Sequence, residues 1–144
     1  MAPLRRELAR LSSRQPGCRA LRKAHYGIGA LLSVAARAEL GDCRRFSPSD
    51  DAVRHTGLDV TVDDSDGRRA RGHIARQGPP VLRWALDEAA LYASRPASPD
   101  YAYFCSVRDR IDGQRALLPV ARKLARRCSH TLRDLDEDAL LPAA

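Results

Sequence analysis

Aromatic side chains are scarce in this chain, which has one Trp, four Tyr and two Phe among 144 residues. Hydrophobic residues still make up 44% of the sequence and charged residues 30%, a composition typical of a globular domain. The core must therefore be built mostly from Ala, Leu and Val, which favours closely packed helices. So few rings also argue against a bare aromatic platform for stacking single-stranded bases. The length suits one domain.

Apolar residues recur at helical spacing over most of the chain. The expected helices span residues 4–13, 18–24, 30–40, 48–55, 80–94, 99–111 and 116–135. Ser47 is expected to cap the fourth of these helices and Pro48 to be its first residue. Pro119 must either start the last helix or kink it. Trp84 is expected in the core or at its edge, the common position for a lone tryptophan.

One stretch departs from the helical pattern. Residues 58–62 alternate like a strand, Asp66-Gly67 is a hairpin signal, and residues 71–74 are the expected return strand. We therefore predict a mainly α, compact helical domain with a helix-hairpin-helix-like element and one short arginine-rich loop or β-hairpin.

The net charge of +7 is unevenly spread. Five arginines and no acid lie between residues 68 and 83, namely Arg68, Arg69, Arg71, Arg76 and Arg83. A second basic run near the C-terminus contains Arg122 and Lys123. Clustered arginines indicate a polyanionic partner such as DNA. The alternative is a solvated arginine-rich face.

The chain has neither a secretory signal at its start nor an apolar run that spans a bilayer. We therefore expect a cytoplasmic protein without a membrane partner. Its four cysteines, Cys18, Cys43, Cys105 and Cys128, contain no CxxC pair. Buried reduced thiols are thus expected rather than a zinc site.

The segment Tyr26-Gly27-Ile28-Gly29 separates two helical stretches, as in a helix-hairpin-helix. Such a turn directs backbone N–H groups at a DNA phosphate without reading the base sequence. Gly27 and Gly29 are therefore candidate nucleic-acid contacts. The alternative is an ordinary turn between helices.

Ser65 lies on a turn beside several arginines, in Asp64-Ser65-Asp66-Gly67-Arg68-Arg69. A serine so placed is a candidate nucleophile for a phosphodiester, with the arginines stabilising charge on the phosphoryl oxygens. The alternative is ordinary Ser-Asp-Gly turn chemistry. Carboxylates crowd the same turn, and we expect them to offset the arginines rather than hold Mg²⁺; no metal site is predicted in this chain.

Several ordered motifs between residues 25 and 135 together resemble the C-terminal domain of the insertion-sequence 110/116 family of transposases. They are Tyr26-Gly27-Ile28-Gly29, Ala38-Glu39-Leu40-Gly41-Asp42, Arg45-Phe46, Thr56-Gly57-Leu58, Ser65-Asp66-Gly67-Arg68-Arg69, Gly72-His73-Ile74-Ala75-Arg76-Gln77-Gly78-Pro79-Pro80, Leu82-Arg83-Trp84-Ala85-Leu86 and Ala121-Arg122-Lys123-Leu124.

The resemblance implies a DNA strand-exchange enzyme. Ser65 matches the serine that attacks a DNA phosphate to form a covalent phosphoserine link, and Arg68, Arg69 and Arg71 match the basic residues after it. Gly78 and Arg83 match the family's Gly…Leu-Arg segment. Because transesterification conserves the phosphodiester energy, no nucleotide cofactor is expected.

The resemblance also implies partners: DNA, a structured guide RNA, and a RuvC-like N-terminal domain that carries the acidic ligands for Mg²⁺. Only 25 residues precede Tyr26, so that domain is expected to be missing from this chain. A homo-oligomer is also expected.

The expected organisation is a residual N-terminal helical segment at 1–24, a transposase C-terminal domain at 25–135 and an acidic tail at 136–144. Within the domain we expect the helix-hairpin-helix at 18–41, the Ser/Arg loop at 57–78 and helices over 80–135. Two other functions stay open: a non-catalytic nucleic-acid-binding remnant of a transposase, and a small basic interaction protein.

Overall fold

The computed structural model describes residues 2–61, 64–65, 68–69, 73–74 and 77–143. Its α-helices are α1 (Ala2–Arg14), α2 (Pro16–Ala24), α3 (Ala30–Leu40), α4 (Ser49–Thr56), α5 (Pro80–Ala93), α6 (Tyr101–Arg108) and α7 (Leu117–Asp134). Two short 3₁₀ helices, η1 (Cys43–Arg45) and η2 (Asp136–Leu140), accompany them. The predicted mainly α-helical fold is confirmed.

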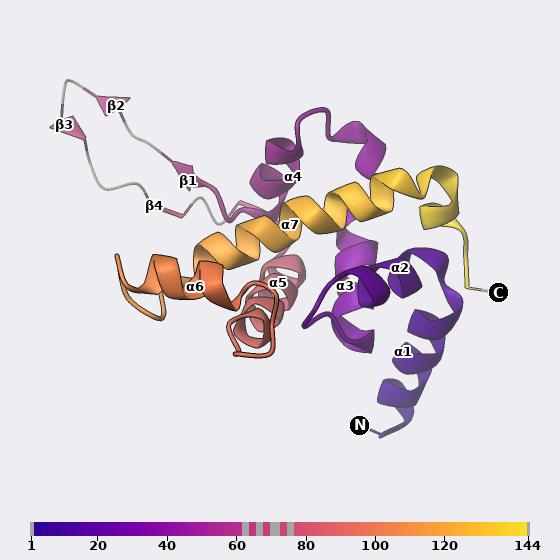
Figure 1. The fold of residues 1–144 in the computed structure, drawn as a ribbon. Coiled ribbons are helices and arrows are strands. Elements are labelled where there is room, and N and C mark those ends of the chain that lie inside the picture. The colour runs from indigo at the N-terminus through magenta and orange to yellow at the C-terminus, as the bar shows by residue number, and fades with distance from the viewer. Residues whose placement is uncertain (1, 62–63, 66–67, 70–72, 75–76, 144) are drawn as a thin grey trace.

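The core lies where α3, α4 and α5 pack against α7, the long helix that crosses the middle of the molecule (Figure 1). Leu82 and Leu86 of α5 and Leu124 of α7 are almost completely buried, with small alanines such as Ala89 and Ala121 between them. Small side chains let the helix axes approach closely. The predicted aliphatic core is therefore confirmed. Trp84 does not belong to it, because 44% of its surface is exposed.

Two helix starts differ from the sequence prediction. Pro16 begins α2, two residues before the predicted start at residue 18, since a proline at the first helical position gives up an N–H that would have no partner there. Pro48 is the N-cap of α4, so Ser47 is not its cap and no side chain bonds the first turn. Pro119 is the third residue of α7 and starts that helix without a lost hydrogen bond.

The joint between α1 and α2 is held by a buried glutamine. The Gln15 side chain accepts a hydrogen bond from the Cys18 N–H at 2.7 Å. Its amide nitrogen donates to the carbonyl oxygens of Ala139 and Leu141, at 2.8 and 3.0 Å. Residues after α7, predicted as an acidic tail, thus include η2, whose Ala139 is buried against α2.

Four two-residue strands extend away from the helices between α4 and α5 (Figure 1). β1 (Val60–Thr61) pairs antiparallel with β4 (His73–Ile74), and β2 (Asp64–Ser65) pairs with β3 (Arg68–Arg69). We call these four strands the arm. The predicted hairpin is confirmed in these strand pairs, with β2 and β3 farthest from the helices.

The cysteines are free thiols, and three of them, Cys18, Cys43 and Cys128, are buried. Burial raises the pKa of Cys43 to about 11 and that of Cys128 to about 12. Cys105 is only half-buried, unlike the prediction. Among the residues described above, no helix is both long and apolar enough to cross a membrane.

Candidate nucleic-acid interface

The arm holds the predicted nucleophile and two of the predicted basic residues. The register of β2 and β3 pairs Ser65 with Arg68 and Asp64 with Arg69. Only two residues separate these strands in the sequence, the shortest common connection in a β-hairpin. Arg71 and Arg76, also predicted as phosphate contacts, lie outside the described residues.

The base of the arm is fastened to α7 by Arg122. Its Nε donates a 2.6 Å hydrogen bond to the carbonyl oxygen of Leu58, just before β1. Burial lowers the pKa of Arg122, the neighbouring Arg126 lowers it further, and Asp59 acts in the opposite direction. Its Nη2 is buried without a hydrogen-bond partner among the described residues. Arg122 therefore helps to set where the arm leaves the helices.

Lys123 follows Arg122 on α7 but contacts a different part of the chain. Its Nζ lies 3.0 Å from the Asp100 carboxylate and 4.4 Å from the centre of the Tyr103 ring. Asp100 is almost fully buried and is also paired with Arg127 at 2.8 Å. Burial alone would raise the pKa of Asp100, but the hydrogen bonds from Lys123 and Arg127 outweigh it and lower that pKa. Lys123 thus holds the start of α6 against α7.

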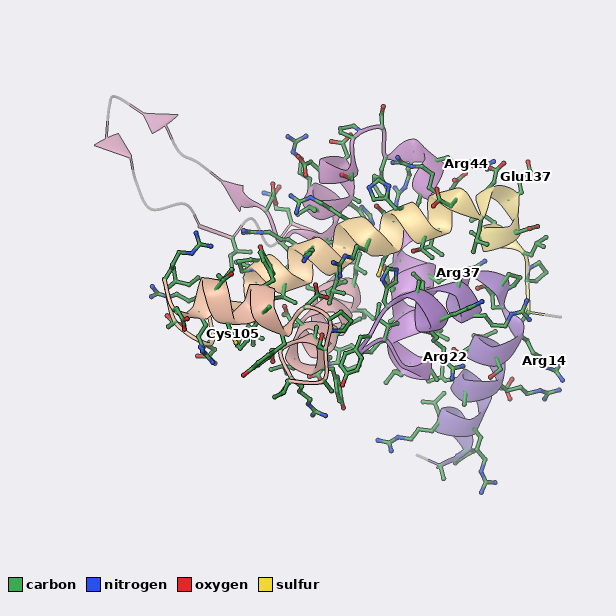
Figure 2. The ribbon with its side chains drawn as sticks, in the orientation of Figure 1. Arg14, Arg22, Arg37, Arg44, Cys105 and Glu137 are labelled. Atoms are coloured by element: carbon green, nitrogen blue, oxygen red, sulfur yellow. The ribbon has the colours of Figure 1, made fainter. Side chains whose placement is uncertain are left out.

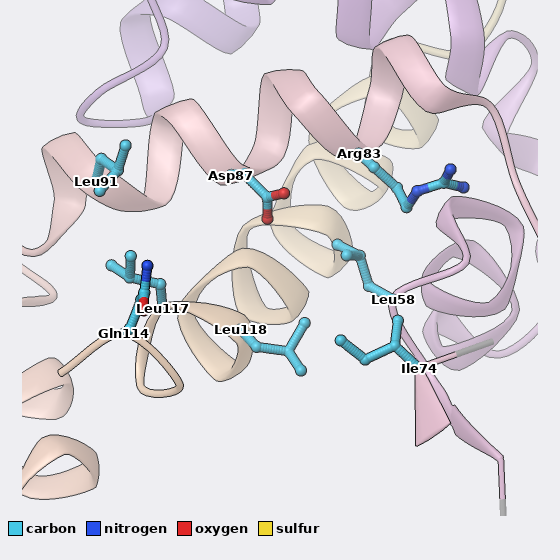
Figure 3. Close-up of a pocket in the computed structure, with 8 residues that line it drawn as sticks. All are labelled: Leu58, Ile74, Arg83, Asp87, Leu91, Gln114, Leu117 and Leu118. Carbon is cyan, nitrogen blue, oxygen red and sulfur yellow. The ribbon is translucent and has the colours of Figure 1, made fainter. Parts of the chain in front are cut away.

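Arg83 lies near the start of α5 and, like Arg122, at the base of the arm. It lines a hollow of about 420 Å³ together with Leu58, Ile74 and Leu118 (Figure 3). Its guanidinium donates to the carbonyl oxygen of Gly78 at 2.6 Å. Asp87, one turn further along α5, also lines the hollow, and partial burial raises its pKa while Arg83 acts to lower it. Arg83 and Arg122 therefore flank the arm base.

Gly78 is needed for packing at this base. A Cβ at this position would lie 2.4 Å from the carbonyl oxygen of His55 and 2.6 Å from the carbonyl carbon of Thr56. Because both are backbone atoms at the end of α4, any side chain would push α4 away from the start of α5. The Gly…Leu-Arg motif thus has a steric reason independent of ligand binding.

The two glycines of the α2–α3 turn have different surroundings. Gly27 has φ +88°, and a Cβ there would lie 2.8 Å from the carbonyl oxygen of Ala89 on α5. Gly29 is the N-cap of α3 with φ −85°, and a Cβ there would have no heavy atom within 4 Å. Gly27 is therefore required by close packing, whereas Gly29 leaves the N-terminus of α3 open.

A hollow of about 490 Å³ lies at this turn, lined by Arg22, His25, Tyr26 and Tyr92 with both glycines. Burial and then the charge of Arg127 lower the pKa of His25, whose Nε2 is 2.8 Å from Thr131 Oγ1. The hollow is at the α5 end near Ala89, whereas Arg83 is at the other end. Six residues of helix correspond to roughly 9 Å along its axis. The glycine turn and the arm base are thus separate places.

The sequence analysis missed a third group of cations. They are exposed on α1 and α2 and consist of Arg5, Arg6, Arg10, Arg14, Arg19, Arg22 and Lys23. Figure 2 shows two of them, Arg14 and Arg22, at the end of the molecule away from the arm. A count of charge by segment, rather than by arginine runs, would have found them.

A family model described as the Transposase IS116/IS110/IS902 family matches residues 17–104, more than half of the chain. The matched residues include the α2–α3 turn, the arm and Arg83, whereas α1 and α7 lie outside them. No curated protein matches the chain.

Proposed function

Since the chain belongs to the IS116/IS110/IS902 transposase family, we propose that it is a DNA strand-transfer domain in which the arm carries the nucleophile. Family membership supports a role in transposition and an interaction with DNA. What we propose beyond family membership is which group attacks the DNA and which residues bind the phosphate.

In the proposed step the Ser65 Oγ attacks the phosphorus of a DNA phosphodiester. A bond forms between Oγ and phosphorus while the bond from phosphorus to one deoxyribose oxygen breaks. The serine loses its hydroxyl proton, and the leaving oxygen gains one to become a free hydroxyl. The product is a phosphoserine diester. Attack by a second strand's hydroxyl reverses the step and joins the strands without a nucleotide cofactor.

The observation that supports this assignment is the register of β2 and β3, which pairs Ser65 with Arg68. Directly opposite residues of an antiparallel pair have Cα atoms roughly 4.5–5.5 Å apart. Arg68 and Arg69 would then offset charge on the phosphoryl oxygens as the new bond forms. Arg71, Arg76 and Arg83 are proposed to bind neighbouring phosphates of the same strand.

Other contacts with the nucleic acid are proposed on the helices. Gly27 and Gly29 would receive a backbone phosphate at the start of α3, and Arg122 and Lys123 would add positive charge along α7. Guide RNA, a homo-oligomer and a RuvC-like domain are the proposed partners. That domain is proposed to hold the Mg²⁺.

The test is a search for a covalent adduct. The chain is mixed with branched DNA bearing the ends of the element, with and without a RuvC-like partner, and denatured products are analysed by mass spectrometry. We expect a protein–DNA adduct that Ser65→Ala abolishes. Ser106→Ala is the matched control, because Ser106 is exposed on α6 and bonds only the carbonyl of Tyr103.

An adduct that persists in Ser65→Ala would exclude Ser65 as the attacking group. If the chain binds DNA but forms no adduct under either condition, the serine chemistry is wrong and the non-catalytic nucleic-acid-binding function is supported instead.

A further inference from the structure

The helices α1 and α2 carry almost the whole net charge of the protein. Seven Lys and Arg residues and one acid, Glu7, lie in residues 2–24. The other 18 Lys and Arg residues are nearly balanced by 17 Asp and Glu residues. We call the seven cations of α1 and α2 the N-terminal basic surface. Its excess of six charges accounts for most of the formal net charge of +7.

Among the described residues, these cations have no acidic partners. Within the described part of the chain, none of the seven lies within 4.0 Å of a carboxylate. Elsewhere, several exposed arginines are paired with acids: Arg54 with Asp51, Arg108 with Asp109 and Arg115 with Asp112. The positive potential of the N-terminal basic surface is therefore not cancelled locally.

The spacing of the cations suits a regular row of phosphates. Arg6, Arg10 and Arg14 recur every four residues, so they follow one another by about 6 Å along one face of α1. A strand of duplex DNA carries a phosphate every ~3.4 Å of axis, so alternate phosphates match this spacing. On α2, Arg19 and Arg22 reach back to the Arg14 carbonyl and the Ser12 hydroxyl.

The apolar side of α1 already packs within the protein. The Ser12 hydroxyl is buried 2.8 Å from that of Ser33 on α3, and Leu8 is partly buried on the same side. A helix that lies on a membrane needs a free apolar face, and of the large apolar side chains of α1 only Leu4 and the edge of Leu11 are exposed. Charge without a free apolar face favours a nucleic acid over a lipid surface.

We propose that the N-terminal basic surface binds the sugar–phosphate backbone of duplex DNA without reading its sequence. Residues 2–14 lie before the segment that the family model matches, so this contact is additional to the arm and does not depend on serine chemistry. The surface lies at the opposite end of the molecule from β2 and β3 (Figure 1). A duplex held there engages a different stretch of DNA from the arm.

The test compares two triple variants with equal loss of charge. Arg6→Gln, Arg10→Gln and Arg14→Gln are combined, since glutamine keeps helix propensity. The matched control combines Arg54→Gln, Arg108→Gln and Arg115→Gln, whose arginines are exposed but paired with acids. Affinity for a labelled 30-base-pair duplex of arbitrary sequence is measured by fluorescence anisotropy over a salt series.

We expect the α1 variant to lose roughly 10- to 100-fold in affinity at low salt and to flatten the slope of log K against log[salt] by about 3. The control should change the slope by less than about 1. Equal losses in both variants, or no loss in the α1 variant, would overturn the proposal. Circular dichroism establishes that both variants keep their helices.

Two further measurements identify the ligand and separate this inference from the catalytic proposal. Tighter binding of an RNA duplex of equal length, or of phosphatidylserine vesicles, that is lost only in the α1 variant would overturn the assignment to DNA. Ser65→Ala should leave the slope unchanged. This assay therefore tests the DNA contact independently of whether the serine forms an adduct.

Discussion

Arginine has different roles in two regions of this molecule, the helical body around α7 and the helices α1 and α2. In the helical body around α7, cations are fixed to internal partners, such as Arg127 to Asp100 and Arg122 to the Leu58 carbonyl. On α1 and α2, cations such as Arg6 and Arg10 extend into solvent without a carboxylate within 4.0 Å in the described residues. Arginine thus stabilises the fold in the helical body, whereas on α1 and α2 it leaves a positive surface potential that no nearby acid cancels.

The difference teaches that a basic run in a sequence does not by itself identify a binding surface. The run that contains Arg122 and Lys123 looks like a polyanion site, yet both side chains have internal partners. The cations of α1 are more scattered in sequence but share exposed helix faces. The cations of α1 differ from that run in having few acidic residues nearby. The sequence shows this difference only when the charges of each segment are added together.

The largest effect is expected when the buried acid of the body is removed. Asp100→Ala leaves Lys123 and Arg127 without their shared carboxylate and should lower the free energy of unfolding by about 2–3 kcal/mol. Asp109→Ala removes an exposed partner of Arg108 and should cost less than about 0.5 kcal/mol. Urea unfolding measures both variants. Similar costs for the two would abolish the distinction between internal and exposed pairs.

A smaller effect is expected at Arg133, which forms no ion pair with the described residues. Its guanidinium donates to the carbonyl oxygens of Phe46 and Cys43 and so ties η1 to α7. Arg133→Gln should lower the free energy of unfolding by about 1–2 kcal/mol because these acceptors lose a charged donor. Arg95→Gln is the control, since Arg95 only covers the exposed Tyr92 ring. Equal costs would argue against a positional role for Arg133.

Lowering the pH should destabilise the helical body for the same reason as Asp100→Ala does, but to a lesser degree. The pKa of Asp100 is lowered in the folded state, so its contribution is present above the unfolded value near 3.8 and is lost as pH falls through the folded value. Thermal melts of the wild type should therefore fall more steeply below pH 4 than those of Asp100→Asn. Parallel curves for the two proteins would mean that Asp100 contributes no pH-dependent stability.

The smallest effect on stability is expected at the N-terminal basic surface. Replacing Arg6, Arg10 and Arg14 by glutamine should change the free energy of unfolding by less than about 0.5 kcal/mol, although it weakens DNA binding. The sign should be stabilising at low salt, because like charges four residues apart repel. Urea melts at two salt concentrations check this. A large loss of stability would make these arginines part of the fold instead of a free surface.

Much of the helical body could be predicted from the sequence, because strong periodicity fixes which face is buried. In α5, Leu82, Ala85 and Leu86 recur at helical spacing and are buried together. In α3 the spacing is less decisive: Leu31 is 46% exposed and its neighbour Leu32 is buried. That helix is apolar on several sides, so periodicity alone does not choose its buried face.

The candidate site was less predictable, since its contacts join distant segments. The Asp66-Gly67 signal correctly predicts a hairpin, and the β2–β3 register follows from it. Nothing local to Arg122 shows that its partner is a carbonyl 64 residues earlier. Trp84 was expected in the core or at its edge, and the structure leaves 44% of its surface exposed, outside the aliphatic core.

The Gln15 amide at the α1–α2 joint has a consequence for how the protein matures on the ribosome. Its acceptors, the carbonyls of Ala139 and Leu141, are made 124 and 126 residues later. At a synthesis rate of roughly 5–20 residues per second, these hydrogen bonds cannot form until about 6–25 s after Gln15 is added to the chain. Although α1 and α2 emerge before α3–α7, they are therefore among the last of these helices to be fixed in place, and the nascent chain exposes this cationic segment before those helices are made.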